Sequence, residues 1–184
     1  MADNKYLIIF GVIFLMILIG MIAGLQPSNV SHIREYEFAD YINGTGFTAD
    51  AGNNLNIINY MNEGFWQGNE SNAIPWEIHI YFYNVTHFDA VDSVHKYNSS
   101  SGTPSSHIVT RFIWCTTHND WMALEEFTNE EKWFTHTKRI EDSSHYIYPN
   151  GTVIIKYEHP ANGNVQHDIW IDVCRLVSYE NVIS

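Results

Sequence analysis

The hydrophobic and polar positions divide the chain into one continuous apolar stretch and a longer segment of short, alternating runs. Residues 6–25 are twenty consecutive residues without a charge. A helix of this length rises about 30 Å, the thickness of the hydrocarbon core of a bilayer. We therefore expect residues 6–25 to be a transmembrane signal-anchor helix, residues 1–5 to be a short cytoplasmic tail, and residues 26–184 to be an extracellular or lumenal domain.

Two alternatives compete for the apolar segment. A cleaved signal peptide usually has an apolar region of about 7–15 residues and an A-x-A-like cleavage site, which Met21-Ile22-Ala23 matches poorly. A type IV pilin-like helix would carry an early acidic residue, but no acid lies between Asp3 and Glu35. Lys5 and the α-amino group weakly favour a cytoplasmic N-terminus. The uncleaved anchor is the preferred interpretation.

Alternation in the domain predicts β-strands. In the run 76–86, Ile78, Ile80 and Phe82 fall on one face, and the other face is mixed. The opposite positions of that run are His79, Tyr81, Tyr83 and Val85. The run 107–117 is apolar on both faces, which is typical of a central strand. Residues 56–61 could form a first short strand, and the run 98–106, NSSSGTPSS, reads as a loop.

The C-terminal half adds one helix candidate and further strands. Residues 119–134 could form a helix, with a capping residue at Asn119 or Asp120 and a capping box at 128–131. Residues 132–140 then return as a strand, and Pro149-Asn150-Gly151 predicts a type I′ hairpin turn. The last strand is expected over 165–177. We therefore predict a mainly β fold, an antiparallel β-sandwich with one short helical excursion.

Acceptor triplets for N-glycosylation are more frequent than composition explains. About 2.3 would arise by chance from 18 Asn and 24 Ser or Thr among 184 residues, whereas the chain has six. All six lie on the same side of the apolar segment, which suits an exported domain carrying N-linked glycans. The expected acceptors are Asn29, Asn43, Asn69, Asn84, Asn98 and Asn150.

The two cysteines suggest the same compartment. Cys115 and Cys174 lie in strand-like runs, and an even count on an oxidising side favours a disulfide. Closing a loop of about 60 residues would stabilise the fold by roughly 4 kcal/mol. Two buried free thiols are the alternative.

Charge and motifs exclude several function classes. The formal charge is −12 with nine Lys and Arg, so nucleic acid is not an expected partner. The ten histidines show no metal-ligand spacing, and His79 and His87 would lie about 27 Å apart along a strand. Asp168 and Asp172 would be about 13 Å apart, too far for a catalytic pair. We expect no catalytic residues, no metal and no cofactor.

The tryptophans are the remaining candidates for binding, because aromatic side chains dominate both sugar-binding platforms and protein interfaces. Trp66 and Trp76, near Gly64, Gly68 and Pro75, are expected to be the most exposed of the six. The favoured function is a membrane-anchored glycoprotein that acts as a structural or interaction subunit of a membrane complex, surface filament, envelope or virion. Its partners would be the bilayer through residues 6–25 and other protein subunits. A carbohydrate- or ligand-binding surface domain is the alternative, followed by an accessory, possibly metal-binding, subunit of a membrane enzyme.

Overall fold

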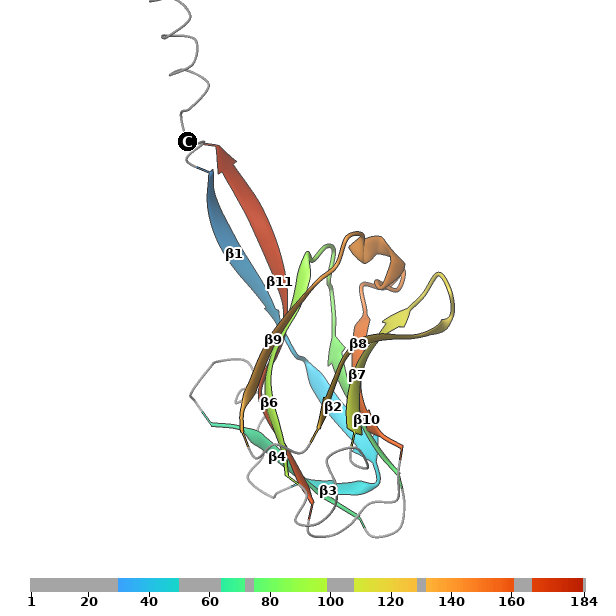
Figure 1. The fold of residues 1–184 in the computed structure, drawn as a ribbon. Helices are drawn as coiled ribbons and strands as arrows, with labels where there is room; N and C mark the ends of the chain where they lie inside the picture. The colour runs from blue at the N-terminus through green and yellow to red at the C-terminus, as the bar shows by residue number, and fades with distance from the viewer. Residues whose placement is uncertain are drawn as a thin grey trace, which may run out of the picture. The chain divides into compact units, whose positions relative to one another are not determined.

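The structure is a computed structural model that describes residues 30–49, 64–71, 75–98, 108–128, 132–160 and 167–183. The chain divides into two compact units, one of Met1–Ile33 with Asn181–Ser184 and the other of Arg34–Glu180. The larger unit contains two β-sheets (Figure 1). The predicted membrane segment, residues 6–25, and the expected short strand at 56–61 lie outside the described residues. Within the described part, no helix combines the length and the hydropathy needed to cross a bilayer.

Each sheet is named here by its central strand. The β11 sheet has the order β3-β4-β11-β6-β9, and β1 also pairs with β11. The β10 sheet has the order β2-β5-β10-β7-β8. Their strands are β1 (Val30–Phe38), β2 (Tyr41–Thr45), β3 (Phe47–Ala49), β4 (Trp66–Glu70), β5 (Trp76–Phe82), β6 (Ala90–Asn98), β7 (Ile108–Cys115), β8 (Asp120–Thr128), β9 (Phe134–Arg139), β10 (Val153–His159) and β11 (Asp168–Ile183).

The core forms because alternate residues of the two sheets point toward one another. On β5, Ile78, Ile80 and Phe82 are fully buried, as the alternation predicts. Trp66 and Trp76 belong to the same core, with 3% and 1% of their surface exposed, so the prediction that they are exposed is wrong. Both occupy inward positions of strands β4 and β5. Burying a large aromatic ring stabilises the fold more than leaving the ring exposed to water.

The edges of the two sheets differ in whether the chain connects them directly. On one side the chain passes from β2 of the β10 sheet to β3 of the β11 sheet through Gly46, which has a φ of +78°. A Cβ at Gly46 would lie 2.2 Å from the Pro75 carbonyl oxygen and 2.6 Å from the Trp76 Cα. Both the backbone angle and the close approach therefore require glycine. On the other side the sheets end in the edge strands β8 and β9.

The helix predicted over 119–134 is wrong. Residues 120–128 form β8, which pairs with β7 along its whole length from Ile108 opposite Thr128 to Cys115 opposite Asp120. A tight turn at residues 116–119 joins the two strands, and Asn119 has a φ of +53°. Pairing with a buried neighbour strand overrides a modest local helix preference. The described helical element is instead a 3-10 turn, Ser143–His145, whose Asp142 Oδ1 accepts from the Ser144 amide at 3.0 Å.

Several strands agree with the sequence pattern and others were not foreseen. Strands β5, β7 and β9 lie within the predicted runs, and the last strand is confirmed but ends later, at Ile183. A turn forms at Pro149-Asn150-Gly151, with the Gly151 amide donating to the Tyr148 carbonyl at 2.8 Å. The predicted type I′ hairpin is wrong, because Asn150 lacks a positive φ and only the second arm is a strand, β10. The unforeseen strands are β1, β2, β3, β4 and β6.

Replacing Gly46 with alanine should destabilise the larger unit by about 2 kcal/mol or more, because the new Cβ meets backbone at a positive φ. Gly151 also has a φ of +78°, but its nearest backbone atom would be 3.1 Å away. Gly151→Ala should therefore cost less, about 1 kcal/mol. Denaturant unfolding of the full chain, followed by tryptophan fluorescence, measures both. Equal losses of stability in the two variants would contradict the close packing of backbone around Gly46.

Candidate functional site

The outer face of the β10 sheet carries most of its aromatic side chains in adjacent rows. Residues directly opposite one another in an antiparallel pair point to the same side of the sheet. Tyr41 lies opposite Tyr81, and Asn43 lies opposite His79. These positions alternate with the buried residues of β5, so they face outward. The term aromatic face is used here for Tyr41, His79, Tyr81, Tyr83, Phe112, Trp114 and Trp121.

Three tyrosines form one half of the aromatic face. The ring centroids of Tyr41 and Tyr81 are 5.7 Å apart, and those of Tyr81 and Tyr83 are 6.4 Å apart. Tyr41 is 48% exposed and Tyr83 is 42% exposed. Burial raises the pKa of Tyr81, with the neighbouring Tyr83 adding to this effect. The three rings therefore form one contiguous surface, of which Tyr41 and Tyr83 are the exposed ends.

Histidine and tryptophan rings continue the surface across the sheet. The His79 ring lies 6.3 Å from Tyr81 and 5.5 Å from Trp121, and Trp121 meets Trp114 edge to face at 5.1 Å. Strands β5 and β8 are separated by β10 and β7, so their backbones are about 14 Å apart. The His79 and Trp121 side chains therefore lean toward each other over the middle of the sheet.

A lysine lies beneath this contact. The Lys156 Nζ is 4.9 Å from the centre of the Phe112 ring and 4.7 Å from that of Trp121, and Lys156 is only 7% exposed. It forms an ion pair with Glu158 and approaches Glu77 at 4.0 Å. Cation–π contacts and two carboxylates compensate the buried charge. The two partly exposed carboxylates form an acidic rim beside the rings.

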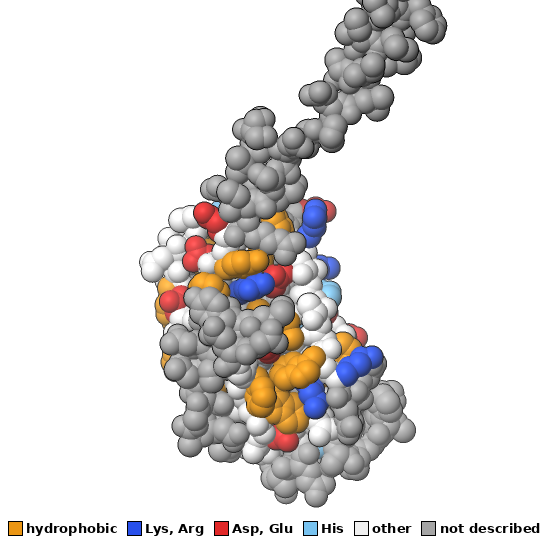
Figure 2. Space-filling model, turned by 90° about the vertical axis from the view of Figure 1, so that its left-hand side faces the viewer, with side chains coloured by type: hydrophobic (Ala, Val, Ile, Leu, Met, Phe, Trp, Pro, Cys, Tyr) orange, Lys and Arg blue, Asp and Glu red, His pale blue; other side chains and the backbone are white. Residues whose placement is uncertain are grey.

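The outer side of the β11 sheet is different in character. Figure 2 views the molecule from the side on which β4, β6 and β9 lie in Figure 1, and shows hydrophobic side chains with Lys and Arg beside them. The Lys96 Nζ lies 4.9 Å from the centre of the Trp170 ring, and the Arg175 guanidinium lies 3.8 Å from that of Tyr36. Each of these two rings is covered by its own cation, and Tyr36 also stacks on Phe38 at 6.5 Å.

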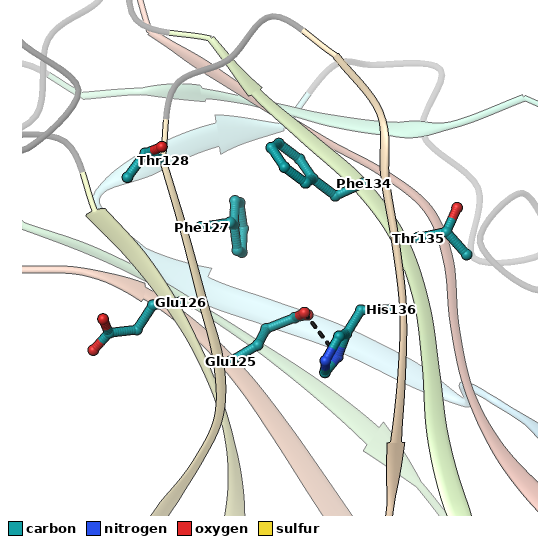
Figure 3. A pocket seen from close by; sticks show the side chains of 7 residues that line it. All are labelled: Glu125, Glu126, Phe127, Thr128, Phe134, Thr135 and His136. Atoms are coloured by element: carbon teal, nitrogen blue, oxygen red, sulfur yellow. Dashed lines mark ion pairs between the residues drawn. The ribbon is translucent and has the colours of Figure 1, made fainter.

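A second region with convergent polar groups is a pocket of about 330 Å³ between the edge strands β8 and β9 (Figure 3). Its residues come from both sheets, and the Glu125 and His136 side chains point toward each other across it. The Glu125 Oε2 is 2.8 Å from the His136 Nδ1. The pocket is lined by Glu125, Glu126, Phe127, Thr128, Phe134, Thr135 and His136.

The Glu125 carboxylate is fully engaged behind this pocket. Its Oε1 lies 3.0 Å from the Nε of Arg111 and accepts from the Ser93 hydroxyl at 3.2 Å. The His95 Nε2 is 3.8 Å from the same oxygen. Arg111 and His95 are fully buried. Because its oxygens already have these partners, Glu125 joins the sheets and is a poor candidate for acid–base chemistry.

The surroundings of His95 and His136 lower the pKa of both side chains. Burial, followed by the Arg111 and His136 charges, places the pKa of His95 well below its usual value. Burial also lowers the pKa of His136, against an opposing effect of Glu125 and with help from Arg111 and Lys138. A proton on either ring would be added beside a guanidinium that is already charged. Protonation of His95 therefore costs stability, because its ring is fully buried beside the Arg111 charge.

A buried carboxylate also joins the sheets elsewhere in the core. Glu70, 2% exposed, accepts from Trp76 Nε1 and from the Tyr97 hydroxyl at 2.7 Å. The His167 Nδ1 is 3.2 Å from its other oxygen. Burial raises the pKa of the Tyr97 hydroxyl far above its usual value, so Tyr97 remains a donor. These contacts connect β4, β5 and β6, and they are structural.

The predicted glycosylation acceptors are scattered over the molecule, and their occupancy remains a prediction. Asn43 is an exposed residue of β2, and Asn69 lies on β4, where its Oδ1 accepts from Gln67 at 3.2 Å. Asn84 is exposed with a φ of +58°, and Asn98 ends β6. Asn150 is exposed in the turn before β10, and its Oδ1 accepts from the Thr152 amide at 3.2 Å. Asn29 lies outside the described residues.

No disulfide joins Cys115 and Cys174 in the structure, where both are buried free thiols, in contrast to the prediction. The pairing register of β11 shifts between Ile171 and Val173, so Cys174 points into the core instead of sharing a face with Asp168. Its thiol contacts Tyr157, which lies opposite Arg111, four residues and about 13 Å along β7 from Cys115. A disulfide needs Cα atoms within about 7 Å. Burial raises the pKa of Cys174 to about 12.

The remaining candidates do not assemble into a metal or catalytic site. In the described ranges, no three His, Cys, Asp or Glu side chains are arranged to hold a metal ion. His79 belongs to the aromatic face, whereas His87, in the connection after β5, pairs with Asp89 at 3.1 Å. Asp168 is half-buried, and Asp172 sits in the irregular part of β11. The sequence pattern did identify the outward residues of β5, but not their continuation by Trp114 and Trp121.

No family model matches this chain, and no curated protein is similar to it. Solved structures with similarity include a "Carbohydrate binding module family29" with 13% identity over 82% of this chain and 90% of that chain, at a TM-score of 0.48. A mutant of CBM29-2, described as probing ligand recognition, has 12% identity over 82% and 87%, also at 0.48. Another CBM29-2 mutant, complexed with cellulohexaose, has 12% identity over 82% and 93%, at 0.46.

Acidification should destabilise the larger unit through His95. Because its pKa in the folded state is lower than in the unfolded state, its contribution is complete above about pH 6.5 and is lost as the pH falls through the folded-state pKa. Thermal unfolding between pH 7.5 and 5 should show this decline, and His95→Phe should flatten it. His145→Gln, whose parent side chain is 49% exposed, is the control and should retain the full slope. A pH slope unchanged by His95→Phe would exclude this cause.

Removing the Glu125 carboxylate should be far more damaging than removing the whole ion pair. Glu125→Leu leaves the Arg111 charge buried without its main carboxylate and should cost about 3–5 kcal/mol. In Arg111→Met/Glu125→Leu, most of this loss should be recovered, because no uncompensated charge remains. Denaturant unfolding of four chains, the native chain, Glu125→Leu, Arg111→Met and the double variant, tests the coupling. Additive losses in the double variant would show that the two residues act independently.

Proposed function

We propose that the aromatic face binds a neutral oligosaccharide. The observation that carries the proposal is the continuity of the rings: neighbouring centroids from Tyr41 to Trp114 lie 5.1–6.4 Å apart on one face of one sheet. A pyranose ring has an apolar C–H surface of similar width that packs against an aromatic ring. Several such rings in a row suit a chain of sugar units. The proposal rests on these side chains and not on the structural similarities.

Polar groups beside the rings match the other half of a sugar, its hydroxyls. Glu77 lies opposite Glu158 across the β5–β10 pair, and both are partly exposed at 40% and 32% of their side chains. Carboxylate oxygens accept hydrogen bonds from hydroxyl groups, and the Asn43 amide can both donate and accept. Lys156 forms an ion pair with Glu158 and lies 4.0 Å from Glu77, which holds both carboxylates beside the rings. Few, well-placed polar groups around an apolar surface are typical of ligand sites.

The charge distribution favours a neutral ligand over an anionic one. The whole chain has a formal charge of −12, and the cation of the aromatic face, Lys156, is buried beneath rings and already paired. An acidic sugar would meet Glu77 and Glu158 without an accessible cation to receive it. Like charges at an interface lower both affinity and association rate. Sulfated and uronic-acid polymers are therefore poor candidates.

The membrane anchor would give this binding face its location. If residues 6–25 span a bilayer, the aromatic face is presented outside the cell or in a lumen, where oligosaccharides are accessible. The proposed protein is therefore a membrane-anchored lectin-like surface domain without catalytic activity. Its anchor and orientation are inferred from the sequence alone.

Glycan-array binding of the full chain, followed by calorimetry with the best neutral oligosaccharide, tests the proposal. Tyr81→Ala and Trp121→Ala should each weaken binding about ten-fold, which corresponds to about 1.4 kcal/mol. Tyr81→Phe retains the ring and should bind nearly as well as the native chain. Trp170→Ala, on the outer side of the β11 sheet, is the matched control and should have no effect.

Two results would overturn this function. One is the absence of binding to any neutral oligosaccharide on the array by an unglycosylated chain whose thermal unfolding shows it to be folded. The other is an equal loss of affinity in Trp170→Ala and Trp121→Ala, since that would place the ligand away from the aromatic face. A preference for anionic sugars would refute the charge argument.

A further inference from the structure

A predicted glycosylation acceptor lies within the aromatic face itself. Asn43 is on β2, the edge strand of the β10 sheet, and is exposed. The register places Asn43 opposite His79 and Thr45 opposite Glu77. Residues two apart in a strand share a face. Both residues that define the acceptor triplet therefore point to the side on which the rings lie.

The Asn43 side chain contacts the centre of the tyrosine row. Asn43 partly offsets the rise in the pKa of Tyr81 that burial and the neighbouring Tyr83 cause, so the two side chains lie close together. Tyr41, two residues before Asn43, stacks near the same Tyr81 ring at 5.7 Å. The amide nitrogen that would carry a glycan is thus next to the most exposed rings of the face.

The middle residue of the triplet fixes this orientation. A Cβ on Gly44 would lie 2.0 Å from the Glu77 carbonyl oxygen and 2.5 Å from the Phe47 ring. The backbone of β2 is therefore packed closely against β5 at this point, where Gly44 lies opposite Ile78. Asn43 cannot exchange faces with Gly44 without breaking the strand pairing.

We infer that N-glycosylation of Asn43 places a glycan over the aromatic face, where its sugars occupy the rings and exclude external oligosaccharides. This inference rests on the proposed function and adds its regulation: the unmodified chain is open and the modified chain is occupied by its own glycan. The tethered sugar has a high effective concentration at the face, so even weak stacking suffices to compete.

The covalent step is a substitution at the anomeric carbon of a lipid-phosphate-linked oligosaccharide. The bond from C1 to the phosphate oxygen breaks, and the oxygen keeps the electron pair. A bond forms from C1 to Nδ2 of Asn43, and one amide proton leaves. The modified nitrogen retains one N–H. No oxidant or reductant is needed.

Acceptors elsewhere in the chain provide internal controls. Asn98 ends β6 in the other sheet, opposite Asp168 of β11, and its triplet can be removed by Ser100→Ala. For Asn43 itself, Thr45→Ala removes the triplet and leaves the asparagine in place, whereas Thr45→Ser retains the triplet. The comparison of Thr45→Ala with Thr45→Ser therefore changes glycosylation of Asn43 while altering only one outward side chain of β2.

The full chain and the three variants should be produced in a glycosylating host and in a non-glycosylating bacterial host. Glycopeptide mass spectrometry reports modification at Asn43, and calorimetry reports affinity for the neutral oligosaccharide found on the array. From the glycosylating host, Thr45→Ala should bind at least ten-fold more tightly than the native chain, Thr45→Ser and Ser100→Ala. From the bacterial host all four should bind equally.

A direct structural readout separates failure of this inference from failure of the proposed function. In the glycosylated chain, nuclear Overhauser contacts should join the Asn43-linked sugars to the Tyr81 ring, whether or not any external sugar binds. Their absence, an unmodified Asn43 beside modified Asn98, or equal affinities of the native chain and Thr45→Ala would overturn the inference. If the contacts are present but no chain binds external sugar, the glycan position is correct and the proposed function is wrong.

Discussion

The arrangement of the β10 sheet depends on one buried ion pair. The Arg111 guanidinium is fully removed from solvent, so it must keep the Glu125 carboxylate beside it, 3.0 Å away. This requirement fixes Arg111 opposite Glu125 in the pairing of β7 with β8. A slip of β8 by one residue would turn Glu125 outward and leave the Arg111 charge buried without its carboxylate. Phe112 and Trp114 therefore face solvent because Arg111 faces the core.

The alternation of inward and outward positions along the strands places some aromatic residues in the core and others on the outer face of the β10 sheet. On β5 the inward positions, from Trp76 to Phe82, supply core volume, while Tyr81 and its outward neighbours remain accessible. Lys156 then holds the outer rings of β7 and β8 in place from below, through cation–π contacts and its ion pair with Glu158. A half-buried ring held in this way loses little conformational entropy when a ligand packs on it.

The parts of the fold that the sequence predicts are those with two-residue periodicity and an apolar inner face, such as β5 and the second arm of the turn at Asn150. Strand β6 was missed because two of its inward residues, Ser93 and His95, are polar and find partners only across the core. The segment 119–134 carries capping residues that suit a helix, but pairing with β7 decides its structure. Long-range partners, invisible in local sequence, account for these differences.

The same long-range pairing decides which aromatic residues can serve binding. Trp66 lies beside glycines in sequence, which suggested exposure, but its strand turns it into the core. Trp121 was assigned to a helix and is instead part of the outer surface. Strand β2 completes that surface from an edge, and an exposed edge strand invites pairing with other chains. A glycan on Asn43 would shield this edge and the rings together, since the outer row of β2 belongs to both.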